Sequence, residues 1–269
     1  MKPIIYDCDI SQMSDDALKT MFKQVVSNLV VIFKNQKVSV EDELRICQVA
    51  GEVMPTFGRF EDISAANGIM RVTGKKDAKG NEGLFGHKTV LDWHANQPSN
   101  PDRKPIIWIH ALKGTVGSRT SWLDMVAAYN DLPEDLREYV QDIEMYCGYS
   151  AGRYSTSPYF HEHVNWENKV KLLYTNPEGL TGLMFPYFQV FEFVGKSELE
   201  FKLMTKLLWE HCLQEKYMYH HDWQNGDIVI SEQWLTLHKR WPFEDMENRL
   251  LHRVAFGYEN IYTSQAAVA

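Results

Sequence analysis

Cysteine is scarce in this sequence, which has four among 269 residues and no C-x-x-C pair. A chain of this length does not depend on disulfides to stabilise its core. The four thiols are therefore expected to be reduced, as in a cytoplasmic protein. They are Cys8, Cys47, Cys147 and Cys212.

An excess of basic residues and long apolar runs are also missing. The 28 Lys and Arg residues are outnumbered by 36 Asp and Glu, which gives a formal net charge of -8, whereas nucleic acids and anionic membranes require a basic surface. No apolar run approaches the roughly 18 residues of a membrane span, and Asp7 and Asp9 interrupt the region where a signal peptide would be apolar. We therefore expect a soluble, cytoplasmic protein that acts on a small molecule, without nucleic-acid or membrane partners. Assembly into a homo-oligomer stays open.

The composition is that of a chain with a full core, because 44% of its residues are hydrophobic and 13% are aromatic. This predicts a single domain over residues 1–269. Near its start, residues 14–27 combine a capping serine with apolar residues at helical spacing, residues 28–35 form a β-branched run, and residues 39–51 repeat the capped helical pattern. The opening is predicted to be helix, strand, helix. Residues 74–88 hold four glycines and four lysines, which predicts a loop.

Strands should dominate the rest of the chain. Branched and aromatic residues are concentrated in four segments, 104–113, 170–177, 226–236 and 252–262. Helical patterns interrupt them at 121–140 and 196–216. Helices at the front and among many short strands predict a mainly β, double-layer fold with flanking α-helices.

One short motif suggests metal chemistry. In the segment "LDWHANQPSNP", His94 precedes Asn96 by two positions, directly after a hydrophobic run. Iron oxygenases with a facial triad use two histidines and one acid, so that a carboxylate would be expected where Asn96 stands. Asp92 is not a substitute, because on a regular strand it would share a face with His94 but lie on the wrong side of it.

The end of the chain supplies further candidates. His238 follows an apolar strand and is predicted to lie where strand pairing weakens toward a loop. In "NRLLHR", Arg249, Leu251 and Arg253 alternate along a strand and so share one face, opposite His252. Two arginines on one face of an apolar strand require anions, which are either acidic side chains of the protein or a bound ligand.

These segments together resemble the taurine dioxygenase family of Fe(II)- and 2-oxoglutarate-dependent oxygenases. The resemblance covers nearly the whole chain through "VVIFKNQKVSVEDELRICQVAGEV", "LDWHAN", "GSRTSWLDMVAAYNDLP", "LLYTNP" and "WQNGDIVISEQWLTLH" followed by "NRLLHR". It implies a double-stranded β-helix (jelly-roll) core, Fe(II) held at His94, Asn96 and His238, and 2-oxoglutarate held by Thr120 and Arg249. Arg253 matches a residue that contacts an anionic substrate, although a structural ion pair is the other interpretation.

The resemblance implies an oxidoreductase that hydroxylates or otherwise oxidises a small molecule and releases succinate and CO2. The amide at Asn96 leaves three interpretations open: a weak third ligand in a working oxygenase, a halogenase whose iron takes a halide at this position, or a site that is catalytically retired or mutated to trap a complex. A binding protein that keeps the fold without turnover is a further alternative. Two other histidine pairs, at 161 and 163 and at 220 and 221, are interpreted as surface residues rather than zinc ligands.

Overall fold

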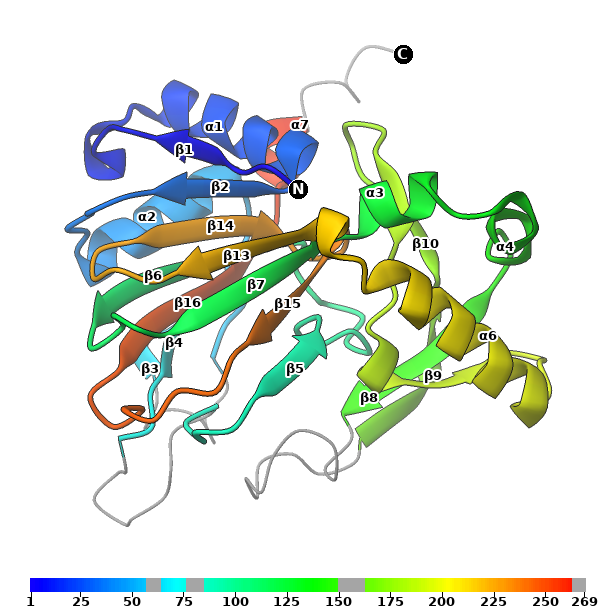
Figure 1. The fold of residues 1–269 in the computed structure, drawn as a ribbon. Coiled ribbons are helices and arrows are strands. Elements are labelled where there is room, and N and C mark those ends of the chain that lie inside the picture. Colours follow the sequence, from blue (N-terminus) through cyan, green and yellow to red (C-terminus); the bar gives the residue numbers. More distant parts are fainter. Residues whose placement is uncertain (57–63, 76–84, 150–162, 263–269) are drawn as a thin grey trace, which may run out of the picture.

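The computed structural model describes residues 1–56, 64–75, 85–149 and 163–262. Two β-sheets of unequal size face each other and carry most of the predicted site (Figure 1). The larger has seven strands in the order β1-β2-β14-β6-β16-β4-β3, and the smaller has four in the order β13-β7-β15-β5. All pairings within them are antiparallel except β1 with β2. This is the jelly-roll fold, although the described strands do not close into a barrel.

The strands of the larger sheet are β1 (Ile4–Tyr6), β2 (Val30–Phe33), β14 (Ile228–Glu232), β6 (Ile106–Lys113), β16 (Leu250–Phe256), β4 (Ile69–Val72) and β3 (Ser64–Ala66). Those of the smaller sheet are β13 (Met218–Asp222), β7 (Arg119–Asp124), β15 (Thr236–Arg240) and β5 (Leu91–His94).

Helices α1 (Asp15–Asn28) and α2 (Val40–Ala50) cover the outer face of the larger sheet (Figure 1). The hydroxyls of Ser14 and Ser39 cap them by accepting from the backbone N–H groups of Ala17 and Asp42. The two predicted helices and the strand between them are confirmed. The structure also contains β1 and a 3-10 turn, η1 (Ile10–Gln12), before them.

A buried carboxylate fastens α2 to the larger sheet. Glu43 is fully buried, and its two oxygens meet the Nδ1 atoms of His110 on β6 at 2.5 Å and His252 on β16 at 2.8 Å. Burial by itself raises the pKa of this carboxyl, but the hydrogen bonds from the two imidazoles outweigh it and lower the pKa. His252 therefore faces the helices, which leaves Arg253 on the face toward the smaller sheet.

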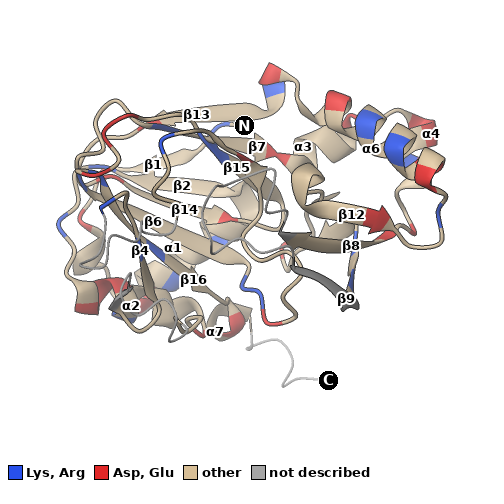
Figure 2. Cartoon of the chain, turned by 90° about the horizontal axis from the view of Figure 1, so that it is seen from below, with Lys and Arg blue, Asp and Glu red and all other residues tan. Residues whose placement is uncertain are grey.

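The chain between β7 and β13 builds a second lobe beside the sheets (Figure 1). Its apolar core also includes residues of the smaller sheet, Trp93, Leu123 and Leu237. The lobe contains α3 (Met125–Asn130), α4 (Glu134–Tyr139), β8 (Glu144–Tyr149), β9 (His163–Lys171), β10 (Leu173–Thr175), β11 (Thr181–Leu183), η3 (Tyr187–Gln189), β12 (Val190–Phe193), α6 (Glu198–Cys212) and η4 (Glu215–Tyr217). Charges of both signs alternate along α6 (Figure 2). The four cysteines are free, as predicted. Within the described ranges, no helix has the length and apolar character needed to cross a membrane.

Two predicted elements need correction. The helix expected at 121–140 begins as strand β7, because Trp122 pairs with Tyr219 and His238 in the smaller sheet, and the remainder is split into α3 and α4 around Pro133. The strand expected at 252–262 ends at Phe256, and α7 (Glu259–Tyr262) follows it. Most of the loop predicted at 74–88 lies outside the described residues, as does His161.

Candidate functional site

Two histidines from neighbouring strands meet between the sheets. His94 ends β5 and pairs with His238 in the middle of β15, so that the centroids of their rings lie 4.1 Å apart. The prediction that His238 lies where pairing weakens is wrong, because β15 pairs with β5 on one side and β7 on the other. Both residues are buried, with 6% and 8% of their surfaces exposed.

The two imidazoles are neutral and one has a defined tautomer. Burial lowers the pKa of His94 to about 4, and the positive charges of Arg253 and Arg240 add to this. Burial, together with His94 and Arg253, holds the pKa of His238 well below its usual range. Nδ1 of His94 lies 2.6 Å from the backbone oxygen of Asp92. A carbonyl oxygen only accepts, so Nδ1 carries the proton and Nε2 keeps its lone pair.

A bulge in β5 decides which residues reach the pocket. The register shifts between His238 and Arg240, which pair with His94 and Leu91 respectively. Leu91 and His94 therefore both line the pocket between the sheets, while Asp92 lines a cavity on the outer face. The prediction that Asp92 shares a face with His94 is wrong. Its carboxylate instead pairs with Lys239 at 3.1 Å.

Asn96 is buried at the edge of the pocket and its side chain is held at both ends. Its Oδ1 accepts from Nη1 of Arg253 at 2.5 Å, and its Nδ2 donates to Oε1 of Gln233 at 3.1 Å. The backbone N–H of Asn96 donates to the same Gln233 oxygen at 2.9 Å. Gln233 was not predicted from the sequence, because nothing in its local pattern distinguishes it from a polar turn residue.

Arg249, directly before β16, extends into the same pocket and is 1% exposed. Its Nε donates to the Ser118 hydroxyl at 3.3 Å, whereas Nη1 is buried and has no hydrogen-bond partner among the described residues. Burial lowers its pKa to about 9, with Arg240 contributing, so the group stays charged at neutral pH. Gly114, at φ 61°, permits the close passage of this segment, because a Cβ there would lie 2.2 Å from the backbone oxygen of Asn248.

Thr120 lines the pocket from β7, where its Oγ1 accepts from the indole Nε1 of Trp223 at 2.9 Å. With that acceptor position used, the hydroxyl proton of Thr120 is available to a ligand. Arg249, Leu251 and Arg253 all line the pocket, which confirms the predicted alternation along the strand.

A third arginine was missed by the sequence analysis. Arg240 lies two residues after His238 on β15 and faces the same pocket, which its spacing could have indicated. It donates to the backbone oxygens of Phe85, His87 and Thr89. No Asp or Glu is found among the described residues that line the pocket. The structure thus gathers three guanidinium groups and two neutral imidazoles there.

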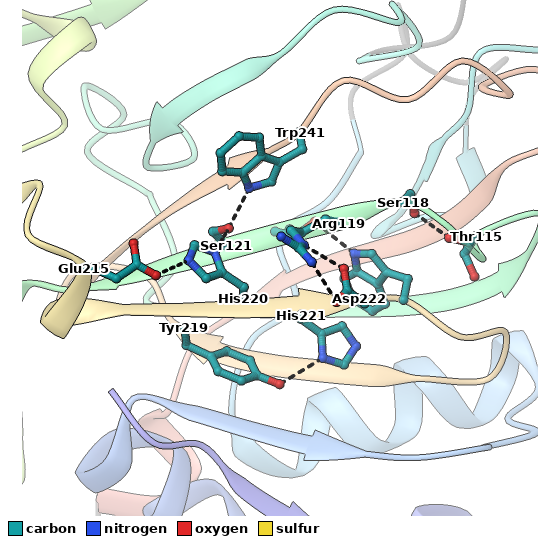
Figure 3. A network of polar contacts seen from close by, with 12 residues as sticks. Thr115, Ser118, Arg119, Ser121, Glu215, Tyr219, His220, His221, Asp222 and Trp241 are labelled. Atoms are coloured by element: carbon teal, nitrogen blue, oxygen red, sulfur yellow. Dashed lines mark hydrogen bonds and ion pairs between the residues drawn. The ribbon is translucent and has the colours of Figure 1, made fainter.

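The outer face of the smaller sheet carries a separate polar network (Figure 3). Ser121 contacts Nδ1 of His220 at 2.5 Å, His220 contacts Glu215 at 2.8 Å, and Trp241 donates to Ser121 at 2.7 Å. These contacts fasten β13, β7 and β15 behind the pocket. His221 points the other way, is 2% exposed and meets Asp227 at 3.0 Å, so the interpretation of both residues as a surface pair is wrong for His221.

No group of three or more His, Cys, Asp and Glu residues that could hold a metal occurs in the described part of the chain. The two pocket histidines have an amide, Asn96, as their third neighbour in the motif, and an amide does not count toward such a group. Any metal site in the pocket therefore depends on two imidazoles and neutral or external ligands.

A protein-family model matches almost the whole chain. Residues 3–255 match the family described as Taurine catabolism dioxygenase TauD, TfdA family. The chain belongs to the TauD, TfdA family. Membership in this dioxygenase family makes it an oxidoreductase, as the sequence predicted.

Relatives of the TauD, TfdA type match the chain over most of their length. Pentalenolactone F synthase of Streptomyces avermitilis is 25% identical over 93% of this chain and 89% of the relative. The alpha-ketoglutarate-dependent 2,4-dichlorophenoxyacetate dioxygenase of Burkholderia sp. (strain RASC) is 24% identical over 90% of this chain and 86% of the relative.

Solved structures of the same fold include AAD-2 in complex with Mn(II) and N-oxalylglycine, with a TM-score of 0.77, 19% identity and 94% coverage of both chains. A taurine dioxygenase from Burkholderia xenovorans has a TM-score of 0.74 at 17% identity, over 94% of this chain and 85% of the other. At these identities the likeness concerns the fold.

Proposed function

We propose that residues 1–269 form one catalytic domain, an Fe(II)- and 2-oxoglutarate-dependent dioxygenase that oxidises a small molecule. The observation that carries the proposal is the buried guanidinium of Arg249, whose Nη1 lacks a partner among the described residues, in the pocket that holds the His94 and His238 imidazoles. A buried donor of a charged group is costly to leave without a hydrogen-bond partner, and a ligand carboxylate would remove that cost.

The donor set fits iron. Neutral imidazole nitrogens bind Fe(II) well, and the bond from His94 Nδ1 to its own strand orients the ring with Nε2 free. His238 would supply the second nitrogen, and the Asn96 carbonyl oxygen a weaker third ligand. Because the amide brings no charge, the metal would keep one more unit of positive charge than with a carboxylate.

The donor groups in the pocket also suit 2-oxoglutarate. The planar fork of Arg249 can donate two parallel hydrogen bonds to the distal carboxylate, and the Thr120 hydroxyl can donate a third. Ser118 holds the Arg249 side chain from the far side through Nε. These residues bind and orient the oxoacid without taking part in bond breaking.

When bound, iron(II) and 2-oxoglutarate supply the oxidising chemistry, in which O2 and 2-oxoglutarate give succinate, CO2 and an oxidised substrate. The protein would orient the reactants in a cationic pocket between the sheets. Arg253 is our candidate contact for an anionic group on the substrate, since it reaches the pocket from β16 next to Asn96.

The halogenase alternative gains no support from the pocket, because Asn96 fills the position that a halide would need and is held there by Arg253 and Gln233. A binding protein without turnover is the remaining alternative. An enzyme should form succinate from 2-oxoglutarate in the presence of iron, ascorbate and O2, even without added substrate. A binding protein should not.

The test measures the binding of iron and 2-oxoglutarate under anaerobic conditions. The visible absorption band of the metal–oxoacid complex reports this binding. The wild-type chain should give the band, and His238→Ala should lose it together with tight iron binding. His220→Ala is the matched control, because it removes an imidazole from the outer face of the same sheet. Full iron occupancy in His238→Ala would contradict the assignment.

A further inference from the structure

A chain of amide hydrogen bonds crosses the edge of the pocket from the start of β6 to β16. Gln233 donates through Nε2 to the backbone oxygen of Lys104, and its Oε1 accepts from the backbone N–H and the Nδ2 of Asn96 at 2.9 and 3.1 Å. Oδ1 of Asn96 then accepts from Arg253 at 2.5 Å. Both amides are buried, at 2% and 6% exposure.

The two ends of this chain fix its direction. The Lys104 carbonyl can only accept, and the Arg253 guanidinium can only donate. Each amide between them must therefore point its NH2 toward Lys104 and its oxygen toward Arg253. Turning either amide around would oppose two acceptors or two donors, so the orientation follows from the chemistry of the neighbours.

We infer that Gln233 is a positioning residue that makes position 96 specific for an amide. A carboxylate at this position has no N–H, so one of its oxygens would face Oε1 of Gln233. If Gln233 turned around to donate, its oxygen would face the Lys104 carbonyl, and the backbone N–H of residue 96 would lose its acceptor. Either arrangement leaves a buried polar contact unsatisfied.

This inference deepens the proposed function and rests on it only in treating residue 96 as part of the metal site. It gives the unusual residue a structural reason, because the surroundings of Asn96 complement an amide on both sides. It also gives Asn96 a role besides metal binding, since its oxygen holds the guanidinium of Arg253 at the pocket wall.

The test is a double-mutant cycle on the full, metal-free chain, with Asn96→Asp, Gln233→Met and the double variant compared in urea unfolding. Methionine is similar in size to glutamine but neither donates nor accepts strongly. Asn96→Asp should raise the equilibrium constant for unfolding at least fivefold more with Gln233 present than in the Gln233→Met background. Attraction between the new carboxylate and Arg253 is common to both backgrounds and cancels.

Asn176→Asp provides the matched control. Asn176 is also buried, and its Nδ2 donates to the backbone oxygen of Val26 at 2.8 Å, away from the chain of amides. Its effect should be the same within about twofold in both backgrounds, as for independent sites. If the effect of Asn96→Asp were also the same within about twofold in the Gln233 and Gln233→Met backgrounds, the inference would be overturned.

A second measurement covers the case in which Gln233→Met does not fold. In the wild-type chain, the side-chain NH2 groups of Asn96 and Gln233 should exchange hydrogen with solvent slowly, as measured by ¹⁵N NMR. Exchange as fast as that of the exposed Asn260 amide would also overturn the inference. Because both measurements are made without metal, a wild-type chain that fails to bind iron would contradict the proposed function and leave this result intact.

Discussion

At the scale of single residues, the pocket is defined by positive charge. Arg240 donates to three backbone oxygens and Arg253 donates to Asn96, whereas Nη1 of Arg249 has no partner among the described residues. The three groups also repel one another, and Arg240 contributes to the lowered pKa of Arg249. An anion bound at Arg249 therefore gains a hydrogen-bonded partner and relieves repulsion in the same step.

Arg249→Ala should raise the 2-oxoglutarate concentration that gives half-maximal succinate formation on the order of 10- to 100-fold, because hydrogen bonds to charged groups contribute about 1.5–3 kcal/mol. The 2-oxoglutarate requirement of Arg249→Lys should lie between those of the wild type and Arg249→Ala, since lysine keeps the charge but lacks the planar fork. Arg119→Ala is the control, because Arg119 pairs with Asp222 on the outer face. An unchanged requirement in Arg249→Ala would exclude the assigned role.

The candidate residues that sequence motifs identified are those with fixed spacing along one strand or within one motif. His94, Asn96, His238, Arg249 and Arg253 were noted from such patterns, whereas Thr120 was named only through the family resemblance; all six line one pocket. Gln233 and Ser118 were missed because their contacts, with Asn96 and Arg249, cross between segments far apart in sequence. Arg240 was missed although it shares a strand face with His238.

At the scale of elements, helices with local signals were predicted well and sheet contacts less so. The capping serines of α1 and α2 act on residues three positions away, so their effect is visible in the sequence. Trp122, by contrast, joins a strand because of partners on β13 and β15 that lie far along the chain. The bulge in β5 that turns Asp92 outward likewise depends on the pairing with β15.

The end of β14 offers a test of how a buried acid affects stability. Glu232 is fully buried, its Oε1 accepts from the backbone N–H of Trp234 at 2.9 Å, and its Oε2 has no partner in the described chain. Burial raises its pKa from 4.5 to about 8, although hydrogen bonds from the backbone of Trp234 and Leu235 act in the opposite direction. The pKa of the Glu232 carboxyl is thus higher in the folded than in the unfolded chain. Below about pH 4.5 this carboxyl is neutral in both states and does not reduce the free energy of unfolding. As the pH rises from about 4.5 to about 8, it ionises more readily in the unfolded chain, and the free energy of unfolding falls.

Glu232→Gln should therefore stabilise the protein at alkaline pH, by on the order of 2 kcal/mol or more at pH 8, and the gain should shrink toward pH 4.5. Urea unfolding of both proteins between pH 4.5 and 9 measures this difference. Glu210→Gln, at an exposed position on α6, should show no such trend. A gain that is constant with pH, or that grows toward acid, would contradict the buried neutral carboxyl.

At the scale of the whole molecule, the pocket is the place where the two sheets meet. His94 and His238 belong to the smaller sheet, and Arg249 and Arg253 reach the pocket from the β16 segment of the larger one. Iron alone would contact only the smaller sheet and Asn96. Bound to iron through its keto acid end and to Arg249 through its distal carboxylate, 2-oxoglutarate would connect the two sheets.

This arrangement predicts that metal and 2-oxoglutarate stabilise the fold cooperatively. A ligand present at 100 times its Kd adds about 2.7 kcal/mol to stability, which is several degrees in Tm for a chain of this size. Mn(II), used to avoid turnover, and 2-oxoglutarate together should raise the Tm by more than the sum of their separate effects. In Arg249→Ala the shift with Mn(II) alone should persist, since both histidines remain. The excess over the sum should shrink, because the oxoacid keeps only its contact with the metal and no longer reaches the larger sheet. If the excess is as large in that variant as in the wild type, 2-oxoglutarate does not bridge the sheets through Arg249.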